Sequence, residues 1–163
     1  METYILQMME GLSRKLEISF WPEQWDALSG PGRVKIVGGG EGGGKSHCGA
    51  FFGLACGLAI ATQLKFSREV LVWFMAAEFE DAHKECEYLI GPEKDWLLDL
   101  GIFDRGASTV PNARTERLIL RTISGVTFET VSGFDPTKVG RDQPDVVVGC
   151  EVGRWPLQLW KRA

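Results

Sequence analysis

The sequence has few of the residues from which metal sites and disulfide frameworks are built. Its 163 residues include four cysteines and two histidines. The cysteines form no CxxC pair and no cluster with a histidine, so the spacing of a zinc site is absent. A disulfide framework is not expected in a chain of this length with this much apolar sequence. The cysteines are therefore predicted to be reduced residues of the core.

Long apolar runs and targeting segments are also missing. The longest apolar stretch, residues 48–61, is too short to span a bilayer and directly follows a glycine-rich loop. Residues 1–17 mix charged with apolar side chains and contain no signal-peptide core. We therefore expect no membrane contact and a location in the cytosol.

The sequence also lacks an excess of positive charge. Lys and Arg total 18 against 22 Asp and Glu, a net charge of −4. This balance argues against a domain that coats nucleic acid by bulk electrostatics, while a local basic groove remains open. One group of basic residues does lie close together in the sequence: Arg114, Arg117, Arg121, Lys138 and Arg141. Acids are interleaved with them, which favours a solvated face over a track for a DNA backbone.

The remaining composition indicates one soluble globular domain, with 44% hydrophobic and 25% charged residues. Helical patterns are predicted at residues 3–16, 20–28, 45–63, 80–90 and 95–100. Apolar, β-rich runs predict strands at residues 33–37, 70–76 and 145–150, and a hairpin is predicted from residues 118–122 and 126–132. Strands that alternate with helices predict an α/β fold, with a mainly parallel sheet flanked by helices and a β-hairpin insertion.

The glycine-rich loop between the first predicted strand and the long helix carries the clearest chemical signal. Its residues fit the pattern GxxxxGK[ST] at every required position: Gly39, Gly40, Glu41, Gly42, Gly43, Gly44, Lys45 and Ser46. Glycines let successive backbone N–H groups point at phosphate oxygens, and the following helix presents its N-terminus to the anion. Lys45 can reach the β- and γ-phosphates, and the Ser46 hydroxyl can ligate Mg²⁺. The loop predicts binding of a nucleoside triphosphate, ATP with Mg²⁺, and His47 stands at the edge of this site.

A carboxylate that could act in hydrolysis follows the strand predicted at residues 145–150. Phosphoryl transfer to water needs one group that positions the water and one that helps to hold the metal. In nucleotide hydrolases with this loop, four apolar residues followed by Asp-Glu usually supply both. Here the apolar residues are followed by Cys150 and Glu151, so Glu151 is the candidate catalytic base and an indirect metal contact. The other interpretation of Glu151 is a surface acid at a strand end. Asp145 cannot replace the missing acid, because it lies at the opposite end of the strand.

A glutamine among aromatic residues is the third feature. The amide of Gln24 could donate to and accept from an adenine edge, while a neighbouring ring stacks on the base. The alternative is a helix with Gln24 exposed, and Trp21 and Trp25 are themselves expected to pack in the core. His83 is expected to be an ordinary surface histidine, and for His47 a bystander role is the simpler interpretation.

The order of these pieces resembles the N-terminal ATPase region of the large terminase subunit of tailed phages, the DNA-packaging motor. The residues that carry the resemblance are FWPEQWDAL, VKIVGGGEGGGKSHCGA, VWFMAAEFEDAHKE and LILRTISGVTFETVSGFDPTKVGRDQPDVVVGCE. Together they span about residues 20–155. The glycine loop is shared by many families, so the specific weight lies on the hairpin, the polar loop and the strand before Glu151.

The resemblance implies a P-loop NTPase fold of the RecA-like (ASCE) kind and hydrolysis of ATP to ADP and phosphate. It implies that Gln24 senses adenine, that Lys45 and Ser46 hold phosphates and metal, and that Glu151 activates water. The implied partners are duplex DNA, the portal protein, the small terminase subunit and further copies in a five-membered ring. The expected location is the host cytoplasm during phage assembly rather than the mature virion. The family continues with a nuclease domain, so the 163 residues are expected to be one N-terminal ATPase domain that stops before its C-terminal part.

Two departures from the family pattern keep other functions open. Cys150 stands where the metal-organising Asp is usual, and Glu41 or glycine stands where the family often has a basic loop residue. The first alternative is a module that binds ATP without hydrolysing it. The second is a helicase-like P-loop ATPase. A small-molecule kinase would need an arginine-rich lid, and the sequence contains no such segment. The sequence does not rank four arginines as a catalytic finger: Arg105, Arg114, Arg141 and Arg154.

Overall fold

The computed structural model describes residues 2–30, 32, 42–92, 94–134 and 143–155. The strand predicted at residues 33–37, most of the polar loop after the hairpin, and Gly39, Gly40 and Glu41 lie outside the described residues. The elements in chain order are α1 (Glu2–Lys15), α2 (Pro22–Ser29), α3 (Lys45–Gln63), β1 (Val70–Ala76), α4 (Phe79–Ile90), α5 (Trp96–Asp99), β2 (Phe103–Thr109), β3 (Ile119–Thr122), β4 (Val126–Ser132), β5 (Val146–Gly149) and the short 3₁₀ helix η1 (Val152–Arg154).

Most of these elements are the ones that the sequence predicts. All five helical patterns form helices, and the hairpin forms around a turn in which Gly125 has a φ of 72°. Glycine populates this left-handed region at little cost. One strand was not predicted: β2 lies at an edge of the sheet and pairs with β3 with a register shift between Asp104 and Thr109.

The sheet has five described strands in the order β2-β3-β4-β1-β5. Strands β4 and β5 pair with β1 in parallel, whereas β2, β3 and β4 pair antiparallel. The sheet is therefore mixed rather than mainly parallel among the described strands. The prediction of a hairpin insertion is also corrected, because β4 is buried along its whole length beside β1. Its apolar and threonine side chains fit a strand that is covered on both faces.

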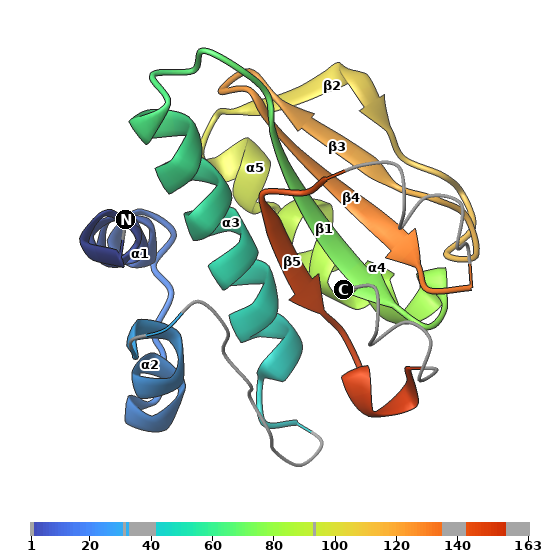
Figure 1. Cartoon of the computed structure of the whole chain (residues 1–163), viewed down its shortest axis with the longest axis horizontal. Coiled ribbons are helices and arrows are strands. Elements are labelled where there is room, and N and C mark those ends of the chain that lie inside the picture. Colours follow the sequence, from blue (N-terminus) through green and yellow to red (C-terminus); the bar gives the residue numbers. More distant parts are fainter. Residues whose placement is uncertain (1, 31, 33–41, 93, 135–142, 156–163) are drawn as a thin grey trace.

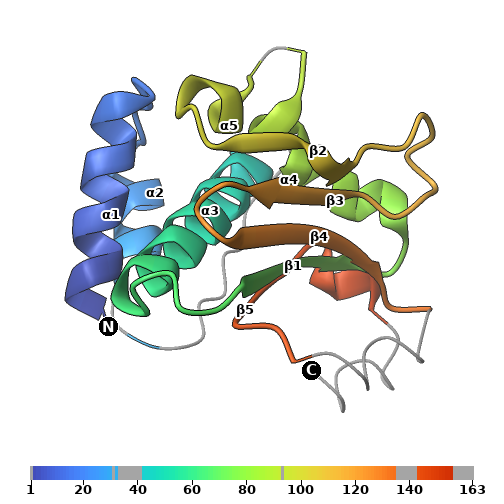
Figure 2. The same ribbon diagram turned by 90° about the horizontal axis from the view of Figure 1, so that it is seen from above.

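Helices α3 and α4 contact each other and pack with alternate β1 residues in one large core. Val72 and Phe74 belong to that core, while Trp73 and Met75 pack with Val131 in a smaller cluster on the opposite face. Helices α1 and α2 lie against α3, on the side away from β2 and β3 (Figures 1 and 2). Among the described residues, no helix is long and apolar enough to cross a membrane.

Glycines spaced four residues apart bring α3 close to the sheet. A Cβ at Gly57 would lie 2.8 Å from Val126 Cγ1 and 2.9 Å from Val72 Cγ2. A Cβ at Gly53 would lie 3.0 Å from the Phe74 ring, and one at Gly49 would lie 3.3 Å from Val148 Cγ1. Glycine in a helix interior is destabilising by roughly 0.5–1 kcal/mol relative to alanine. Here its lack of a side chain allows a helix–sheet distance that alanine at Gly57 would not fit.

Candidate functional site

The direction of α3 places its N-terminus at the carboxyl edge of the parallel strands. Gly57, late in the helix, faces Val72 and Val126 near the strand starts, whereas Gly49 faces Val148 near the end of β5. The helix therefore runs opposite to β1, β4 and β5, as Figure 1 shows. Ligands of open α/β sheets bind at this carboxyl edge. The chain thus brings Lys45 and Ser46 to the same edge as the residues that follow β5.

The described part of the glycine loop has the backbone geometry that its glycines predict. Gly42 and Gly44 have φ angles of 72° and 74°, and Gly44 is the N-cap of α3. Lys45 and Ser46 form the first turn of this 19-residue helix. The N-terminal end of a helix carries a partial positive charge and backbone donors directed at a ligand. This end of α3 can therefore receive an anion.

Gln24 links helix α2 to the glycine loop. Its Nε2 donates to the Gly43 carbonyl at 3.1 Å, and its Oε1 accepts from the Trp21 backbone N–H at 3.0 Å, which caps α2. A Cβ on Gly44 would lie 2.6 Å from Gln24 Nε2. The close contact explains a glycine at position 44 in addition to its φ angle. The carbonyl oxygen and one amide hydrogen of Gln24 are already used, so adenine sensing remains a prediction that would need the second hydrogen or a rearrangement.

His47 belongs to an aromatic cluster behind the loop. Its ring centroid lies 5.3 Å from Phe20, 5.1 Å from Tyr88 and 5.3 Å from Trp96. Burial, and then the charge of Lys94, lowers the pKa of His47. The ring is packed as an uncharged aromatic group, which favours its interpretation as a bystander.

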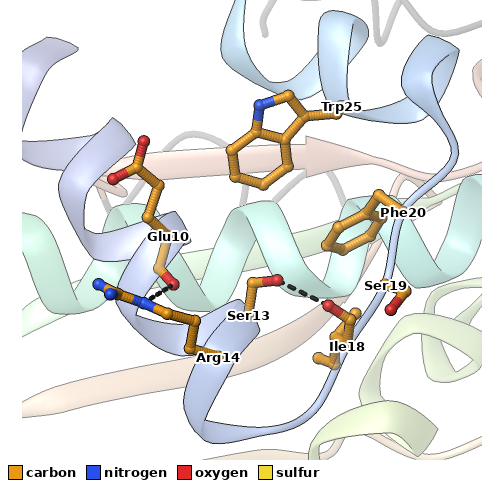
Figure 3. Close-up of a pocket in the computed structure, with 7 residues that line it drawn as sticks. All are labelled: Glu10, Ser13, Arg14, Ile18, Ser19, Phe20 and Trp25. Atoms are coloured by element: carbon orange, nitrogen blue, oxygen red, sulfur yellow. Dashed lines mark hydrogen bonds between the residues drawn. The ribbon is translucent and has the colours of Figure 1, made fainter.

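A cleft of about 530 Å³ lies between α1, α2 and the segment that joins them. Figure 3 shows its lining: Glu10, Ser13, Arg14, Ile18, Ser19, Phe20 and Trp25. Ser13 Oγ donates to the Ile18 carbonyl at 2.6 Å, and Arg14 Nε donates to the Glu10 carbonyl at 3.3 Å. Phe20 lines the cleft and also stacks on His47, so the cleft adjoins the aromatic cluster at the start of α3.

The predictions about the burial of Trp21 and His83 are wrong. Trp21 was expected in the core and is 64% exposed, because it precedes α2 as its N-cap. Trp25 is half-buried and packs against the core as expected. His83 was expected at the surface but is buried, and its Nε2 lies 2.7 Å from the Glu116 carbonyl oxygen.

Glu85 is a candidate site residue that the sequence did not predict. It lies on α4 with 6% of its surface exposed, and its carboxyl group interacts with the Ser46 hydroxyl and lies beside Cys150, whose thiol donates to the Val148 carbonyl oxygen at 3.6 Å. Burial raises the pKa of Glu85 from 4.5 to about 7, against the opposite effect of the neighbouring Cys150 and Ser46 side chains. The sequence feature that could have identified Glu85 is its place among apolar residues on the buried face of α4, between Ala82 and Leu89.

Cys150 and Glu151 differ sharply in their surroundings. Cys150 is 3% exposed, its N–H donates to the Met75 carbonyl at 2.8 Å, and its own carbonyl accepts from Trp155 Nε1 at 3.0 Å. Burial, and then the neighbouring Glu85, raises the pKa of the Cys150 thiol well above its ordinary range. Glu151 is exposed at the N-cap of η1, with φ 48° and ψ 43°. A left-handed conformation is uncommon for a residue with a side chain.

Charged side chains of α4 and η1 surround Glu151. Lys84 Nζ donates to Asp81 at 2.8 Å, and Arg154 Nη1 lies 3.7 Å from Asp81. The hydrogen bond to Asp81 and the nearby Asp81 and Glu151 charges raise the pKa of Lys84, against the opposing effects of burial and Arg154. Glu151 therefore lies at the carboxyl edge of the parallel strands, close enough to Lys84 for the two charges to interact.

Asp145 lies at the end of β5 opposite to Glu151, as predicted. Arg68 donates to both carboxylate oxygens of Asp145, at 2.9 and 2.6 Å, and the Leu71 N–H donates to it at 3.0 Å. Three of the clustered basic residues also have acidic partners: Arg114 pairs with Glu87, Arg117 with Glu129 and Arg121 with Glu69. Lys138 and Arg141 lie outside the described residues.

Among the described residues, no three His, Cys, Asp or Glu side chains form a group that could hold a metal ion by itself. Ser46 and Glu85 nevertheless provide hard oxygen donors, the kind that Mg²⁺ prefers, beside the end of α3 that can bind phosphate. The carboxyl edge thus combines an anion-binding helix end, a hydroxyl and two acids. Comparisons of the chain with protein-family models, with curated proteins and with solved structures found no match.

Proposed function

We propose that this chain is a P-loop NTPase domain that binds ATP with Mg²⁺ at the carboxyl edge of β1 and β5. The observation that carries the proposal is the position of Lys45 and Ser46. They form the first turn of a long buried helix that follows glycines with positive φ angles, and this turn lies at the ligand-binding edge of the sheet.

Each residue of the loop has a distinct role in this proposal. The glycine loop supplies backbone N–H donors to the phosphates, Lys45 binds the β- and γ-phosphates, and Ser46 ligates Mg²⁺. Gln24 fixes the loop through Gly43 and offers its remaining amide hydrogen to the base. His47 supports the first turn of α3 from the aromatic cluster.

The proposed reaction is hydrolysis of ATP to ADP and phosphate. A water attacks the γ-phosphorus, the bond from the γ-phosphorus to the bridging oxygen breaks, and Glu151 accepts the proton of the water. The exposed position of Glu151 beside the carboxyl edge supports this role. Mg²⁺, when bound, neutralises the developing phosphate charge.

The biological role that we propose is DNA packaging, as a large terminase subunit of a tailed phage. The support is the resemblance in residues 20–155, above all the hairpin and the strand before Glu151. In this proposal the chain acts in the host cytoplasm with duplex DNA, a portal protein and a small terminase subunit, in a ring of copies.

A module that binds ATP without turnover is the second candidate. The observation that favours it is Cys150, a buried thiol at the position where a metal-organising Asp is usual. Release of phosphate by the purified chain, lost in Glu151→Gln, would exclude this candidate. If duplex DNA leaves that rate unchanged, the packaging role is contradicted while the ATPase assignment stands.

The nucleotide site is tested by the substitution Lys45→Ala. A hydrogen bond to a charged group contributes about 1.5–3 kcal/mol, so the affinity for Mg²⁺–ATP should fall by about 10- to 100-fold. Lys15→Ala is the matched control, because it removes the same charge from the exposed end of α1. Calorimetric titration measures both variants. Equal affinity of Lys45→Ala and the parent would refute the proposed site.

A further inference from the structure

A buried acid on α4 faces the site. Glu85 is 6% exposed, and its neighbours on the same helix face are Ala82, Cys86 and Leu89. An isolated carboxylate in a core is destabilising by several kcal/mol unless it is paired or hydrogen-bonded. Leucine or alanine would fit this helix face at less cost, so the acid calls for an explanation.

The surroundings of Glu85 connect three separate elements. Its carboxyl group interacts with the Ser46 hydroxyl at the start of α3 and lies beside Cys150, the residue that follows β5. Gly49 of α3 is next to its stem, since a Cβ there would lie in ordinary contact with Glu85 Cγ, at 3.6 Å. The carboxyl group is thus directed at the hydroxyl that the proposed function assigns to Mg²⁺.

One oxygen of this carboxyl group is open. Glu85 Oε2 has no hydrogen-bond partner among the described residues, although it is fully buried. Buried polar atoms are nearly always satisfied by protein or water. An unpaired carboxylate oxygen beside the Ser46 hydroxyl is a position at which a cation or its bound water would complete the bonding.

We propose that Glu85 supplies the carboxylate that holds Mg²⁺ beside Ser46, in place of an acid at position 150. This inference rests on the proposed function, because the nucleotide provides the remaining ligands. Mg²⁺ is usually held by one or two carboxylates together with substrate phosphates and waters. Two oxygen donors are therefore enough when the nucleotide is present, which agrees with the lack of a three-residue metal cluster among the described residues.

Cys150 fits a supporting role better than a metal-binding one. A sulfur ligand is soft and suits zinc or copper, whereas Mg²⁺ selects hard oxygen ligands. The Cys150 thiol instead donates to the Val148 carbonyl oxygen at 3.6 Å, and its buried side chain lies beside the Glu85 carboxyl group and limits where that group can move. The two acids then have separate tasks: Glu85 organises the metal, and Glu151 faces the water.

The test is the Mn²⁺ affinity of the complex with a non-hydrolysable ATP analogue, measured from the electron paramagnetic resonance signal of free Mn²⁺ with protein in excess. Glu85→Gln keeps the shape and the acceptor for Ser46 but removes the charge. We expect Mn²⁺ affinity to fall at least about 10-fold, while analogue affinity in EDTA is unchanged or higher. Glu80→Gln, on the exposed face of the same helix, should bind Mn²⁺ like the parent.

The outcomes separate this inference from the proposed function. A parent that binds no analogue overturns both. A parent that binds the analogue, with Glu85→Gln equal to it in Mn²⁺ affinity, overturns only the role of Glu85. In the double variant that carries Glu85→Gln and Cys150→Asp, restored Mn²⁺ affinity would support the proposal that Glu85 takes the place of an acid at position 150. If Glu85→Gln does not fold, Glu85→Asp carries the test, because withdrawing the carboxylate by one methylene should also weaken Mn²⁺ binding, and an unchanged affinity contradicts the proposal.

Discussion

The two ends of strand β5 hold acids in opposite states. At the start, both oxygens of Asp145 accept from Arg68, and the Leu71 N–H adds a third hydrogen bond. At the other end, the carboxyl group of Glu85 from α4 lies beside Ser46 and Cys150 but retains an oxygen that has no hydrogen-bond partner among the described residues. The partners of Asp145 lower its pKa, whereas burial raises that of Glu85.

This difference separates a structural acid from a candidate ligand-binding acid. Asp145 ties the segment before β1 to β5 with groups that the chain itself supplies, so it leaves nothing for a ligand to complete. Glu85 is held in a position that is unfavourable for the empty protein. Residues of this kind persist at functional sites, where the ligand provides the missing interaction. Substitutions at each end of β5 test whether the two acids differ in this way.

The largest expected effect is at Glu85. Its folded-state pKa of about 7 lies above the ordinary value of 4.5, so the folded protein holds a proton that the unfolded chain has lost. The free energy of unfolding should therefore fall as pH rises from about 4.5 to about 7, by on the order of 3 kcal/mol. Glu85→Gln cannot lose a proton, and it should be more stable than the parent at about pH 8 by this order of magnitude. Urea unfolding at about pH 5 and about pH 8 measures the difference.

A control for Glu85 is Glu80→Gln, which removes an acid from the exposed face of the same helix. Solvent screens an exposed carboxylate, so this substitution should change the free energy of unfolding by no more than a few tenths of a kcal/mol. If Glu85→Gln shows the same pH dependence as the parent, Glu85 is not the buried acid that limits stability at the carboxyl edge.

The second effect is in the contact between α3 and the sheet, which is tighter toward the start of the strands. A Cβ at Gly57 would lie within 2.9 Å of two valine side chains, whereas a Cβ at Gly49 has 3.3 Å to its nearest neighbour. Gly57→Ala should destabilise the fold by about 1–3 kcal/mol through overpacking. Gly49→Ala should have a smaller effect on the same thermal or urea unfolding curve.

Gly11 provides the reference for the helix-propensity part of these substitutions. It lies on an exposed position of α1, and a Cβ there would meet nothing within 4 Å. Gly11→Ala should stabilise the protein by about 0.5–1 kcal/mol, since alanine loses less entropy in a helix. If Gly11→Ala and Gly57→Ala destabilise the protein equally, overpacking at Gly57 does not explain the loss of stability.

Local patterns in the sequence were sufficient for most elements of the fold. The glycine loop and the apolar residues after it predict α3 from its first residue, Lys45, and the continuous apolar run predicts β1. Strand β2 was missed because its sequence, FDRGAST, has no apolar alternation and its residues are mostly half-exposed or exposed. The parallel pairing of β4 with β1 was also missed, because a hairpin motif does not show which other strand its edges will meet.

The candidate site was predictable only where one segment carries the chemistry. Lys45, Ser46 and Glu151 follow from short motifs, but the Glu85 contacts join segments far apart in the sequence. An acid on the buried face of α4 was visible as an exception to the apolar pattern, yet only the packing of α4 against α3 and the sheet shows its neighbours. The predictions for Trp21 and His83 were wrong for a related reason. The spacing of residues within one segment does not show which other segments will cover them.

The smallest expected effect is at the satisfied end of β5. Asp145→Asn keeps the size of the side chain and removes the charge that pairs with Arg68, whose side chain is 54% exposed. Solvent weakens this pair, so the substitution should destabilise the protein by about 1 kcal/mol or less at neutral pH, and by less still at high salt. Its pKa is lowered from 3.8, so this contribution is present above that pH and is lost as the pH falls through the folded-state pKa. Unfolding curves of the parent and Asp145→Asn should therefore converge in acid, the reverse of the behaviour expected for Glu85→Gln. A loss well above 1 kcal/mol that persists in high salt would show that the amino edge depends on this acid as strongly as the carboxyl edge depends on Glu85, and the contrast between the two ends would fail.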